Sequence, residues 1–379
     1  MLKKSGAVSI GTLRDKSIAI IMDNQYSTGA YIASPNFPMY SYCWLRDGTF
    51  TAYSMDRVGE HQSARKFYLW VDKVIERCAD KVDTLITKDR RDLSIKPNEF
   101  LHTRYKLDGS ECADDWQNFQ LDGYGTWLWG LAEHINITRD NALTTKFSES
   151  IRLTINYLKH FWFTPNYDCW EEFNDKIHPS TLACIYGGLR SINQFIHDQE
   201  IPDICIKIKE LILRKGVYKG RITKYFGSTS IDANLLWLIV PFQMFELTDE
   251  ITKRTVEDIE KKLYTGGVHR YSEDTYYGGG EWILLTAWLG WYYCQVGELG
   301  KARKLLSWIE KQADEKGNLP EQVPNNLNNP NYYSIWIKKW GKIAKPLLWS
   351  HAMYLILDKE LEERREYNQT FPMGDINLE

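Results

Sequence analysis

The chain has 379 residues, of which 43% are hydrophobic and 26% charged, and its formal net charge is −3 at pH 7. This balance is typical of a folded soluble protein and offers no basic surface to nucleic acid. No apolar run approaches the ~20 residues of a membrane-spanning helix, and no apolar export segment follows the basic start, so we expect a cytoplasmic protein without membrane partners.

The first 39 residues read as a lead-in with little helical periodicity. Three short pieces of it resemble strands, and we expect a small hairpin or an extended segment there. The pieces are Gly6–Leu13, Ser17–Met22 and Tyr31–Ser34.

From residue 40 to residue 350 most segments carry apolar residues at helical spacing. One pattern recurs six times: a loop rich in polar and aromatic residues leads into a helix that is apolar on nearly every face. These helices start near Asp47, Asp122, Ser180, Asp232, Glu281 and Lys345. The starts are about 50–75 residues apart, which leaves room for one further, amphipathic helix in each interval.

Helices that are apolar all round are buried, whereas helices with a single apolar stripe pack outside them. Six buried and six outer helices predict an all-α fold, the (α/α)₆ toroid, with the chemistry in the loops that enter the inner helices. No Pro/Gly/Ser-rich linker and no block of charge divides the chain, so we expect one domain over residues 1–379.

Cysteines and aromatic residues narrow the class of ligand. The seven cysteines are scattered singly, without the spacing of zinc ligands, so we expect reduced thiols, no metal and no cofactor. The chain has 15 Trp and 23 Tyr, and many stand beside Asp, Glu, Arg or Asn rather than in apolar runs. Flat apolar faces interleaved with hydrogen-bonding groups suit a sugar.

Loops one and two precede the first two inner helices. Loop one contains Arg46 and Asp47, which would orient sugar hydroxyls; an equally open alternative is a helix-capping Asp with a neighbouring salt bridge. Loop two contains Trp116, a candidate stacking platform. The adjacent Asp114 and Asp115 lack a third metal ligand at useful spacing, which argues against a metal site.

Loop three contains two adjacent carboxylates, Glu171 and Glu172, between Trp170 and Phe173. An apolar wall raises the pKa of a carboxyl group by desolvation, which keeps a general acid protonated near neutral pH. A solvated glutamate pair on a surface is the alternative.

Loops five and six supply further polar groups. Loop five gathers Arg270, Asp274, Tyr276 and Tyr277, more than an exposed turn needs. In loop six, Glu321 lies between two prolines that restrict the backbone, although the same residues also fit the first turn of a helix. Two carboxyl groups far apart in sequence, at the same end of an aromatic-rich toroid, are what glycoside hydrolysis requires.

These motifs, in this order, resemble glycoside hydrolase family 15, the glucoamylase and glucodextranase family. The motifs are Tyr-x-Tyr-x-Trp-x-Arg-Asp, Trp-x₃-Gln-Leu-Asp-Gly, Trp-Glu-Glu, His-Arg-Tyr-x-Glu-Asp-Thr-Tyr-Tyr and Glu-Gln, and the resemblance runs from about Tyr40 to Trp349. It implies an (α/α)₆ barrel and an exo-acting, inverting α-glucoside hydrolase that binds an oligosaccharide.

The resemblance also implies roles for individual residues. Glu171 would be the general acid and Glu321 the general base that activates water. Glu321 would stay ionised in a more polar setting, which Gln322 and Asn325–Asn326 could supply. The substrate-binding residues would be Tyr40, Trp44, Arg46, Asp47, Trp116, Asp122, Trp170, Glu172, Arg270, Asp274, Tyr276 and Trp282.

Only 39 residues precede the first motif, and no starch-binding domain is expected after the barrel, so short saccharides, including isomaltose, are the expected substrates. The linkage stays open among α-1,4, α-1,6 and the α,α-1,1 bond of trehalose. A catalytically silent sugar-binding toroid is a rival, but it needs neither Glu171 nor Glu321. A terpene-cyclase-like toroid is a poorer match because the loops are too polar.

Overall fold

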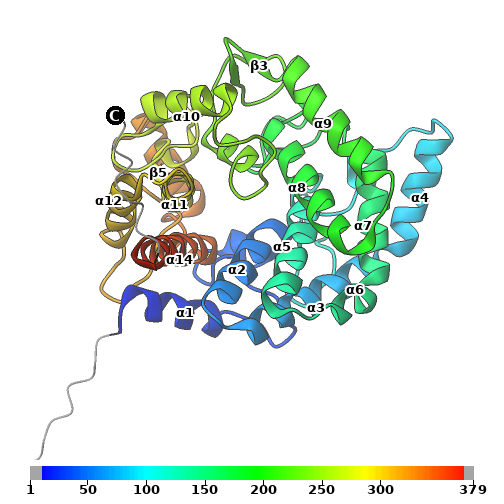
Figure 1. The fold of residues 1–379 in the computed structure, drawn as a ribbon, viewed down its shortest axis with the longest axis horizontal. Helices are drawn as coiled ribbons and strands as arrows, with labels where there is room; N and C mark the ends of the chain where they lie inside the picture. Colours follow the sequence, from blue (N-terminus) through cyan, green and yellow to red (C-terminus); the bar gives the residue numbers. More distant parts are fainter. Residues whose placement is uncertain (1–10, 371–379) are drawn as a thin grey trace, which may run out of the picture.

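The computed structural model describes residues 11–370, and its helices form two concentric rings (Figure 1). In the inner ring each helix packs against the next and the last packs against the first, so the ring is closed. Its members are α2 (Leu45–Arg57), α5 (Asp122–Thr138), α8 (Pro179–Ile196), the 3-10 helix η3 (Ala233–Leu238), α11 (Ile283–Gln295) and α14 (Leu348–Thr370). The outer helices are α1 (Leu13–Asp23), α3 (His61–Arg77), α7 (Ser148–Phe161), α9 (Ile201–Lys215), α10 (Glu250–Leu263) and α12 (Leu299–Glu310). The predicted (α/α)₆ toroid is confirmed.

Short elements decorate the rings. The remaining helices are α4 (Ala79–Arg90), α6 (Ala142–Lys146), α13 (Tyr333–Trp340), and the 3-10 turns η1 (Pro38–Tyr40), η2 (Pro97–Glu99), η4 (Tyr276–Gly278) and η5 (Pro330–Tyr332). The strands form three antiparallel pairs: β1 (Cys43–Trp44) with β2 (Arg104–Tyr105), β3 (Val217–Tyr218) with β4 (Arg221–Ile222), and β5 (Glu281–Trp282) with β6 (Gln322–Val323).

One of the expected strands of the lead-in is wrong. Ser17–Met22 lies inside α1, which begins at a capping box formed by Thr12 and Asp15. This helix packs against α14 and so supplies the outer partner of the last inner helix. The β-branched isoleucines favour strands locally, but packing on α14 decides the conformation. Of the other two pieces, Tyr31–Ser34 contributes a single bridge, and Gly6–Leu13 lies mostly outside the described residues.

The fourth inner element is shorter than expected. The other inner helices begin within three residues of their predicted starts, but the segment after Asp232 is only a six-residue 3-10 helix. Asp232 caps it by accepting a 2.9 Å hydrogen bond from the N–H of Asn234. Pro241 follows soon after, and proline lacks a donor and disfavours helix in the residue before it, so the helix cannot continue.

Contact between α5 and α8 depends on two glycines. A Cβ atom at Gly125 would lie 2.3 Å from the carbonyl oxygen of Cys184, and one at Gly188 would lie 2.1 Å from the carbonyl oxygen of Gly125. Only glycine permits this backbone approach.

An aromatic cluster fills the centre of the inner ring. Phe50 of α2 lies between 5.6 and 6.1 Å, centroid to centroid, from Trp129, Trp237, Trp288 and Trp349, which come from four other inner elements. Part of the aromatic excess is therefore core packing, and the cluster forms a floor below the loops.

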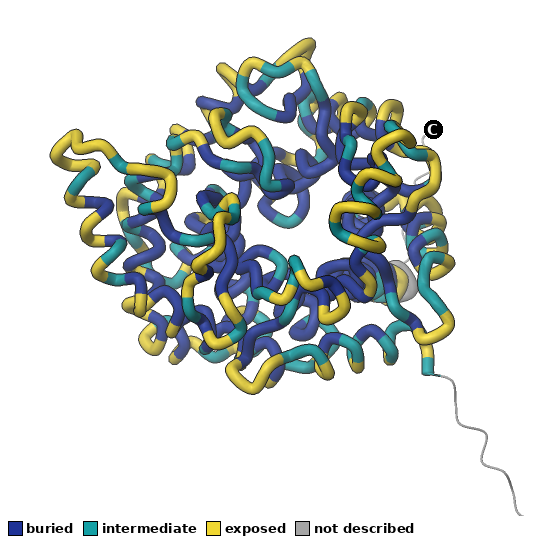
Figure 2. Tube along the Cα trace, turned by 180° about the vertical axis from the view of Figure 1, so that it is seen from behind, coloured by how far each residue is buried: buried dark blue, intermediate teal, exposed yellow. Residues whose placement is uncertain are grey.

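Burial follows the two rings. In Figure 2 the buried residues trace the inner ring and the exposed residues lie on the outer helices and loops. Within residues 11–370, no helix combines the length and apolarity needed to cross a membrane.

Candidate active site

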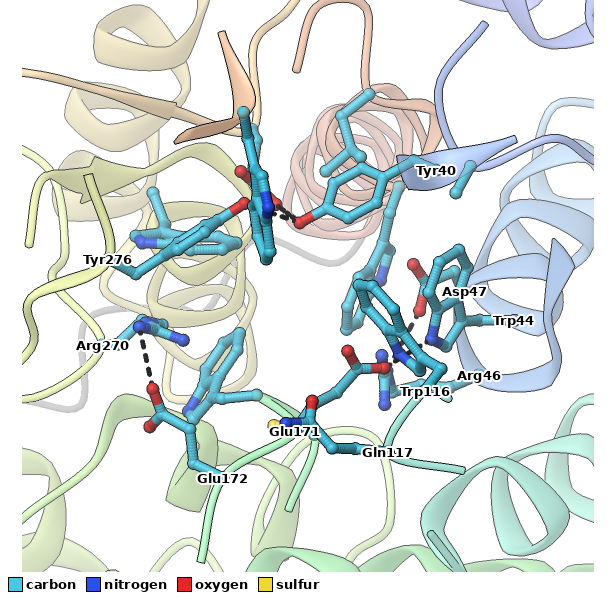
Figure 3. A pocket seen from close by; sticks show the side chains of 18 of the residues that line it. Tyr40, Trp44, Arg46, Asp47, Trp116, Gln117, Glu171, Glu172, Arg270 and Tyr276 are labelled. Atoms are coloured by element: carbon cyan, nitrogen blue, oxygen red, sulfur yellow. Dashed lines mark hydrogen bonds and ion pairs between the residues drawn. The ribbon is translucent and has the colours of Figure 1, made fainter. Parts of the chain in front are cut away.

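The loops that lead into the inner helices enclose a pocket of about 390 Å³ (Figure 3). This volume is near the lower end of the ~300–1,000 Å³ usual for small-molecule sites. Twelve of the fourteen predicted site residues line it: Tyr40, Trp44, Arg46, Asp47, Trp116, Trp170, Glu171, Glu172, Arg270, Tyr276, Trp282 and Glu321. The other two, Asp122 and Asp274, lie behind the wall, where each holds an arginine.

Two of the strand pairs place indoles on the pocket wall. Trp44 of β1 lies opposite Arg104 of β2, and Trp282 of β5 lies opposite Gln322 of β6. Strands β1 and β5 each continue directly into an inner helix, α2 and α11. The two indoles are therefore fixed by a strand pair on one side and a helix on the other.

Glu171 lies in a tight turn with a left-handed backbone (φ +66°), a conformation that residues with side chains rarely adopt. The carboxylate of Asp168 holds this turn, since its Oδ1 accepts 3.0 Å hydrogen bonds from the N–H groups of both Trp170 and Glu172. Backbone strain of this kind persists where surrounding contacts enforce it, and such places are often functional sites.

The carboxyl group of Glu171 is held by two donors. Its Oε1 accepts a 2.8 Å hydrogen bond from the indole of Trp44 and a 3.1 Å hydrogen bond from the amide of Gln120. Burial raises the pKa of Glu171, while the hydrogen bonds and the charge of Arg46 oppose the shift without cancelling it. A carboxyl group of this kind retains its proton to higher pH than an exposed one.

The apolar wall around Glu171 differs from the expected one. Trp170 lines the pocket, but Phe173 is 39% exposed and is not part of the lining. In Figure 3 the indoles of Trp44 and Trp116 lie beside Glu171 instead. The backbone of Phe173 is also left-handed (φ +54°), so the tight turn carries its ring away from the pocket.

Glu321 is 3% exposed, and within residues 11–370 only one of its oxygens has a hydrogen-bond partner. Oε1 accepts a 2.8 Å hydrogen bond from the hydroxyl of Tyr40, which in turn lies 2.8 Å from the hydroxyl of Tyr276. Oε2 is buried and has no hydrogen-bond partner within residues 11–370. Burial raises the pKa of Glu321 to about 7, although the hydrogen bond from Tyr40 and the charge of Arg270 lower it.

The expected polar setting of Glu321 is wrong, because its carboxyl group is buried with a raised pKa and the neighbouring amides bind other groups. The side chain of Gln322 accepts a 3.1 Å hydrogen bond from the N–H of Gly280, and that of Asn326 donates one of 3.2 Å to Glu281. The tyrosine pair takes the place that these amides were expected to fill.

Arg46 is both a structural and a pocket residue. Its guanidinium donates to Asp47 at 3.1 Å, to Asp122 at 2.9 Å and to Gln120 at 3.0 Å, and it lies 4.9 Å from the ring of Trp349 in the floor. These bonds use Nε and Nη1, and for Nη2 no partner is found in the described part of the chain. Burial raises the pKa of Asp47 to about 6, against the charge of Arg46.

Arg270 is arranged in the same way. Asp274 accepts from both its Nε and its Nη2, and Glu172 accepts a longer bond of 3.4 Å from Nη2. Glu172 also accepts a 2.6 Å hydrogen bond from the hydroxyl of Tyr271. Burial raises the pKa of Glu172, and the charge of Arg270 opposes this shift. Figure 3 shows Glu172 below Arg270, on the other side of the pocket from Trp44.

Several residues of the pocket were not predicted from the sequence. Trp336, Lys339 and Trp340 of α13 line the pocket, as does Gln117 of loop two. A Trp-x-x-Lys-Trp pattern on a short helix gives the only sequence signal, because α13 is not one of the ring helices. Gln120, which donates to Glu171, stood inside a recognised motif without an assigned role.

A buried cation supports the turn of Glu171. Lys224 is 2% exposed and lies 2.6 Å from Asp232 and 3.5 Å from Asp168. Asp232 also accepts a 3.0 Å hydrogen bond from the indole of Trp170. The sequence gives no local signal for these contacts, because Asp168 and Lys224 are more than fifty residues apart.

The neighbouring acids of loop two have separate roles. Asp114 pairs with Arg104 at 2.5 Å, whereas Asp115 lines the pocket. Within residues 11–370 no group of three or more His, Cys, Asp or Glu side chains is placed to hold a metal ion.

The chain matches the family model described as "Glycosyl hydrolases family 15" over residues 13–318. It is 40% identical over 354 residues to an isomaltose glucohydrolase of Kribbella flavida, a match that covers 91% of each chain. It is 28% identical to an uncharacterized glycosyl hydrolase of Methanocaldococcus jannaschii, over 86% of this chain and 52% of that one.

Solved structures agree. A wild-type glycosidase aligns with a TM-score of 0.90 at 39% identity, covering 92% of this chain and 96% of that one. A variant glycosidase in complex with glucose aligns with a TM-score of 0.89 over the same shares. A bacterial glucoamylase complexed with acarbose shares the fold at 19% identity, with a TM-score of 0.74 over 93% of this chain and 56% of that one. The chain therefore belongs to glycosyl hydrolase family 15.

Proposed function

We propose that this chain is an exo-acting hydrolase of short α-glucosides, which inverts configuration and releases β-glucose from the non-reducing end. One observation carries the proposal: two carboxyl groups, those of the half-buried Glu171 and the buried Glu321, line a single pocket, and each accepts a hydrogen bond from a wall residue. Tyr40, the partner of Glu321, lies across the pocket from Glu171 in Figure 3.

Glu171 would act as the general acid. Its raised pKa keeps a proton available for the glycosidic oxygen, so the leaving sugar departs as an alcohol rather than an alkoxide. The indole of Trp44 and the amide of Gln120 bind one oxygen, Oε1. The other oxygen then carries the proton towards the substrate.

Glu321 would act as the general base. Tyr40 occupies Oε1, which leaves Oε2, for which the described part of the chain offers no partner, to accept a proton from water. That water would attack the anomeric carbon from the face opposite the leaving group, which inverts its configuration. With its pKa raised to about 7, about half of Glu321 is ionised at neutral pH.

Arg46, Asp47 and Arg270 would hold the hydroxyls of the terminal glucose. All three line the pocket, and both guanidinium groups are fixed by buried carboxylates, Asp122 and Asp274. Preorganised charged groups of this kind orient a substrate at little entropic cost.

The substrate class is proposed from the relatives and the size of the pocket. The Kribbella flavida relative is an isomaltose glucohydrolase, and a pocket of about 390 Å³ suits a short saccharide better than a polymer. We therefore propose α-1,6 disaccharides and trisaccharides as the preferred substrates. The seven free, buried cysteines support a cytoplasmic location.

A substrate panel tests the proposal. Glucose release would be measured from maltose, isomaltose, panose, trehalose, soluble starch and dextran, and isomaltose should give the highest kcat/KM. The highest value on trehalose or on starch would refute the proposed substrate. No release from any of them, with calorimetric binding of isomaltose retained, would identify a silent sugar-binding toroid.

A further inference from the structure

Helix α13 (Tyr333–Trp340) belongs to neither ring, yet it forms part of the pocket wall. Three of its side chains, Trp336, Lys339 and Trp340, line the pocket, although no residue of the helix is fully buried. A helix that contributes large aromatic rings without burying them in the core leaves those rings facing the pocket and its mouth.

The ring of Trp340 contacts aromatic rings on both the Glu321 side and the Glu171 side of the pocket. It lies 6.0 Å from the ring of Tyr276, whose hydroxyl contacts Tyr40, the partner of Glu321. On its other side it faces Trp116 in a stacked arrangement, with centroids 6.3 Å apart and an angle of 27° between the planes.

Trp116 continues this line of rings to the acid. It lies 6.4 Å from Trp44, whose indole donates to Glu171. We call the four residues Tyr276, Trp340, Trp116 and Trp44 the aromatic arc. The arc runs from Tyr276, which contacts the partner of the base, to Trp44, the partner of the acid.

A buried arginine fixes the middle of the arc. The guanidinium of Arg104 lies 4.1 Å from the ring of Trp116 and 3.9 Å from that of Tyr42, and it is fully buried. Its Nη2 pairs with Asp114, whereas Nε and Nη1 have no hydrogen-bond partner within residues 11–370. The aromatic faces therefore add to the stabilisation that Asp114 gives the guanidinium, and the contact with Arg104 holds Trp116 in place to meet Trp340.

We propose that Trp340 is a specificity-determining residue that narrows the mouth of the pocket between Tyr276 and Trp116 and restricts the enzyme to disaccharides and trisaccharides. The inference rests on the proposed function, and it assigns the chain-length limit to one residue of α13. Lys339 lies on the rim, 4.6 and 4.8 Å from the rings of Trp336 and Trp340, and it covers the outer face of the wall.

The test compares Trp340→Ala with the unaltered enzyme on isomaltose and on dextran. Loss of one pocket contact typically costs ~10–200-fold in discrimination. We expect kcat/KM for isomaltose to fall at least tenfold, mainly through KM, and the ratio of dextran to isomaltose to rise by a similar factor. Trp340→Phe, which keeps a ring in the arc, should retain most of the original preference.

Trp162→Ala is the matched control, because Trp162 is also half-buried but lies outside the pocket, at the end of α7. It should leave the ratio unchanged. An unchanged ratio in a folded Trp340→Ala variant, verified by its melting temperature, would overturn the inference. If Trp340→Ala does not fold, the ratio of dextran to isomaltose kcat/KM is measured in Trp340→Leu instead, and the same outcomes apply.

Failure of the proposed function would look different. An unaltered chain that hydrolyses none of these sugars refutes the function alone. The role of Trp340 is then decided by binding, as the ratio of dissociation constants for isomaltose and for a long isomaltooligosaccharide, with and without Trp340→Ala. The same ratio in the unaltered chain and in Trp340→Ala would overturn the role of Trp340.

Discussion

The hydroxyl of Tyr40 donates a 2.8 Å hydrogen bond to Oε1 of Glu321 and lies 2.8 Å from the hydroxyl of Tyr276. A hydroxyl has a single proton, so when Tyr40 gives its proton to Glu321 it accepts one from Tyr276. Hydrogen bonds donated to a carboxylate favour its ionised form. The tyrosine pair therefore limits how far burial raises the pKa of the base.

The first prediction concerns pH. The base must be ionised, so kcat/KM should fall as the pH drops through the pKa of Glu321, about 7 in the free enzyme. Tyr40→Phe removes a contact that lowers this pKa, so the acid limb of the profile should move to higher pH. The measurement is kcat/KM on isomaltose between pH 4 and pH 9. Tyr157→Phe, a buried tyrosine outside the pocket, should leave the limb in place, and an unmoved limb in Tyr40→Phe would refute the assignment.

The second prediction concerns the acid. Glu171→Gln keeps the shape of the side chain but removes the transferable proton, so turnover should fall by ~10²–10⁴-fold with the melting temperature little changed. Glu133→Gln is the control, because Glu133 of α5 is, like Glu171, a half-buried glutamate with a raised pKa, but it lies outside the pocket. Activity of Glu171→Gln within a few fold of the parent would remove Glu171 from the mechanism.

The third prediction concerns Arg46. Lysine keeps the charge but cannot donate to Asp47, Asp122 and Gln120 at once, and it cannot present a further N–H to the sugar. Arg46→Lys should lower kcat/KM by on the order of 10²-fold, the usual effect of misplacing a binding group by about 1 Å. Arg57→Lys at the other end of α2, where Arg57 pairs with Glu360, should have little effect. An unchanged kcat/KM would make Arg46 a purely structural residue.

The ring architecture could be predicted from sequence because its signal is long and periodic. Helices that are apolar on every face must be buried, which an inner ring allows, and five of the six begin where polar loops end. The failures were local. The isoleucines of α1 favour a strand locally, but packing against α14 makes the segment helical. Pro241 shortens the helix that was predicted after Asp232.

For the site, too, the sequence predicted local features better than contacts between distant residues. Residues in contiguous motifs, such as Arg46 with Asp47 or Glu171 with Glu172, could be predicted to share a site because they are adjacent in sequence, and they line one pocket. Partners that meet only through the fold were not, such as Lys224 with Asp168, or Trp340 with Trp116. Asp122 and Asp274 were grouped with the binding residues, since sequence does not distinguish a carboxylate facing the sugar from one behind an arginine.

The last prediction is stereochemical. Oε2 of Glu321 is buried without a partner within residues 11–370, while Tyr40 occupies Oε1, so the carboxylate has one free oxygen for a water molecule. A water between base and anomeric carbon requires the two carboxyl groups to be ~6.5–9.5 Å apart, against ~5–5.5 Å in a retaining pair. We expect the larger separation between Glu171 and Glu321 in a sugar complex.

The product then reports which face the water came from. Attack opposite the leaving group converts an α-glucoside into β-glucose, which later equilibrates with the α form. Proton NMR of the anomeric signals during the first minutes of isomaltose hydrolysis should therefore show β-glucose from the released non-reducing unit before mutarotation. Initial α-glucose from that unit would mean that Glu321 attacks carbon rather than activating water. In that case a glucosyl group would accumulate on Glu321 with a slow substrate, whereas a base leaves the side chain unmodified.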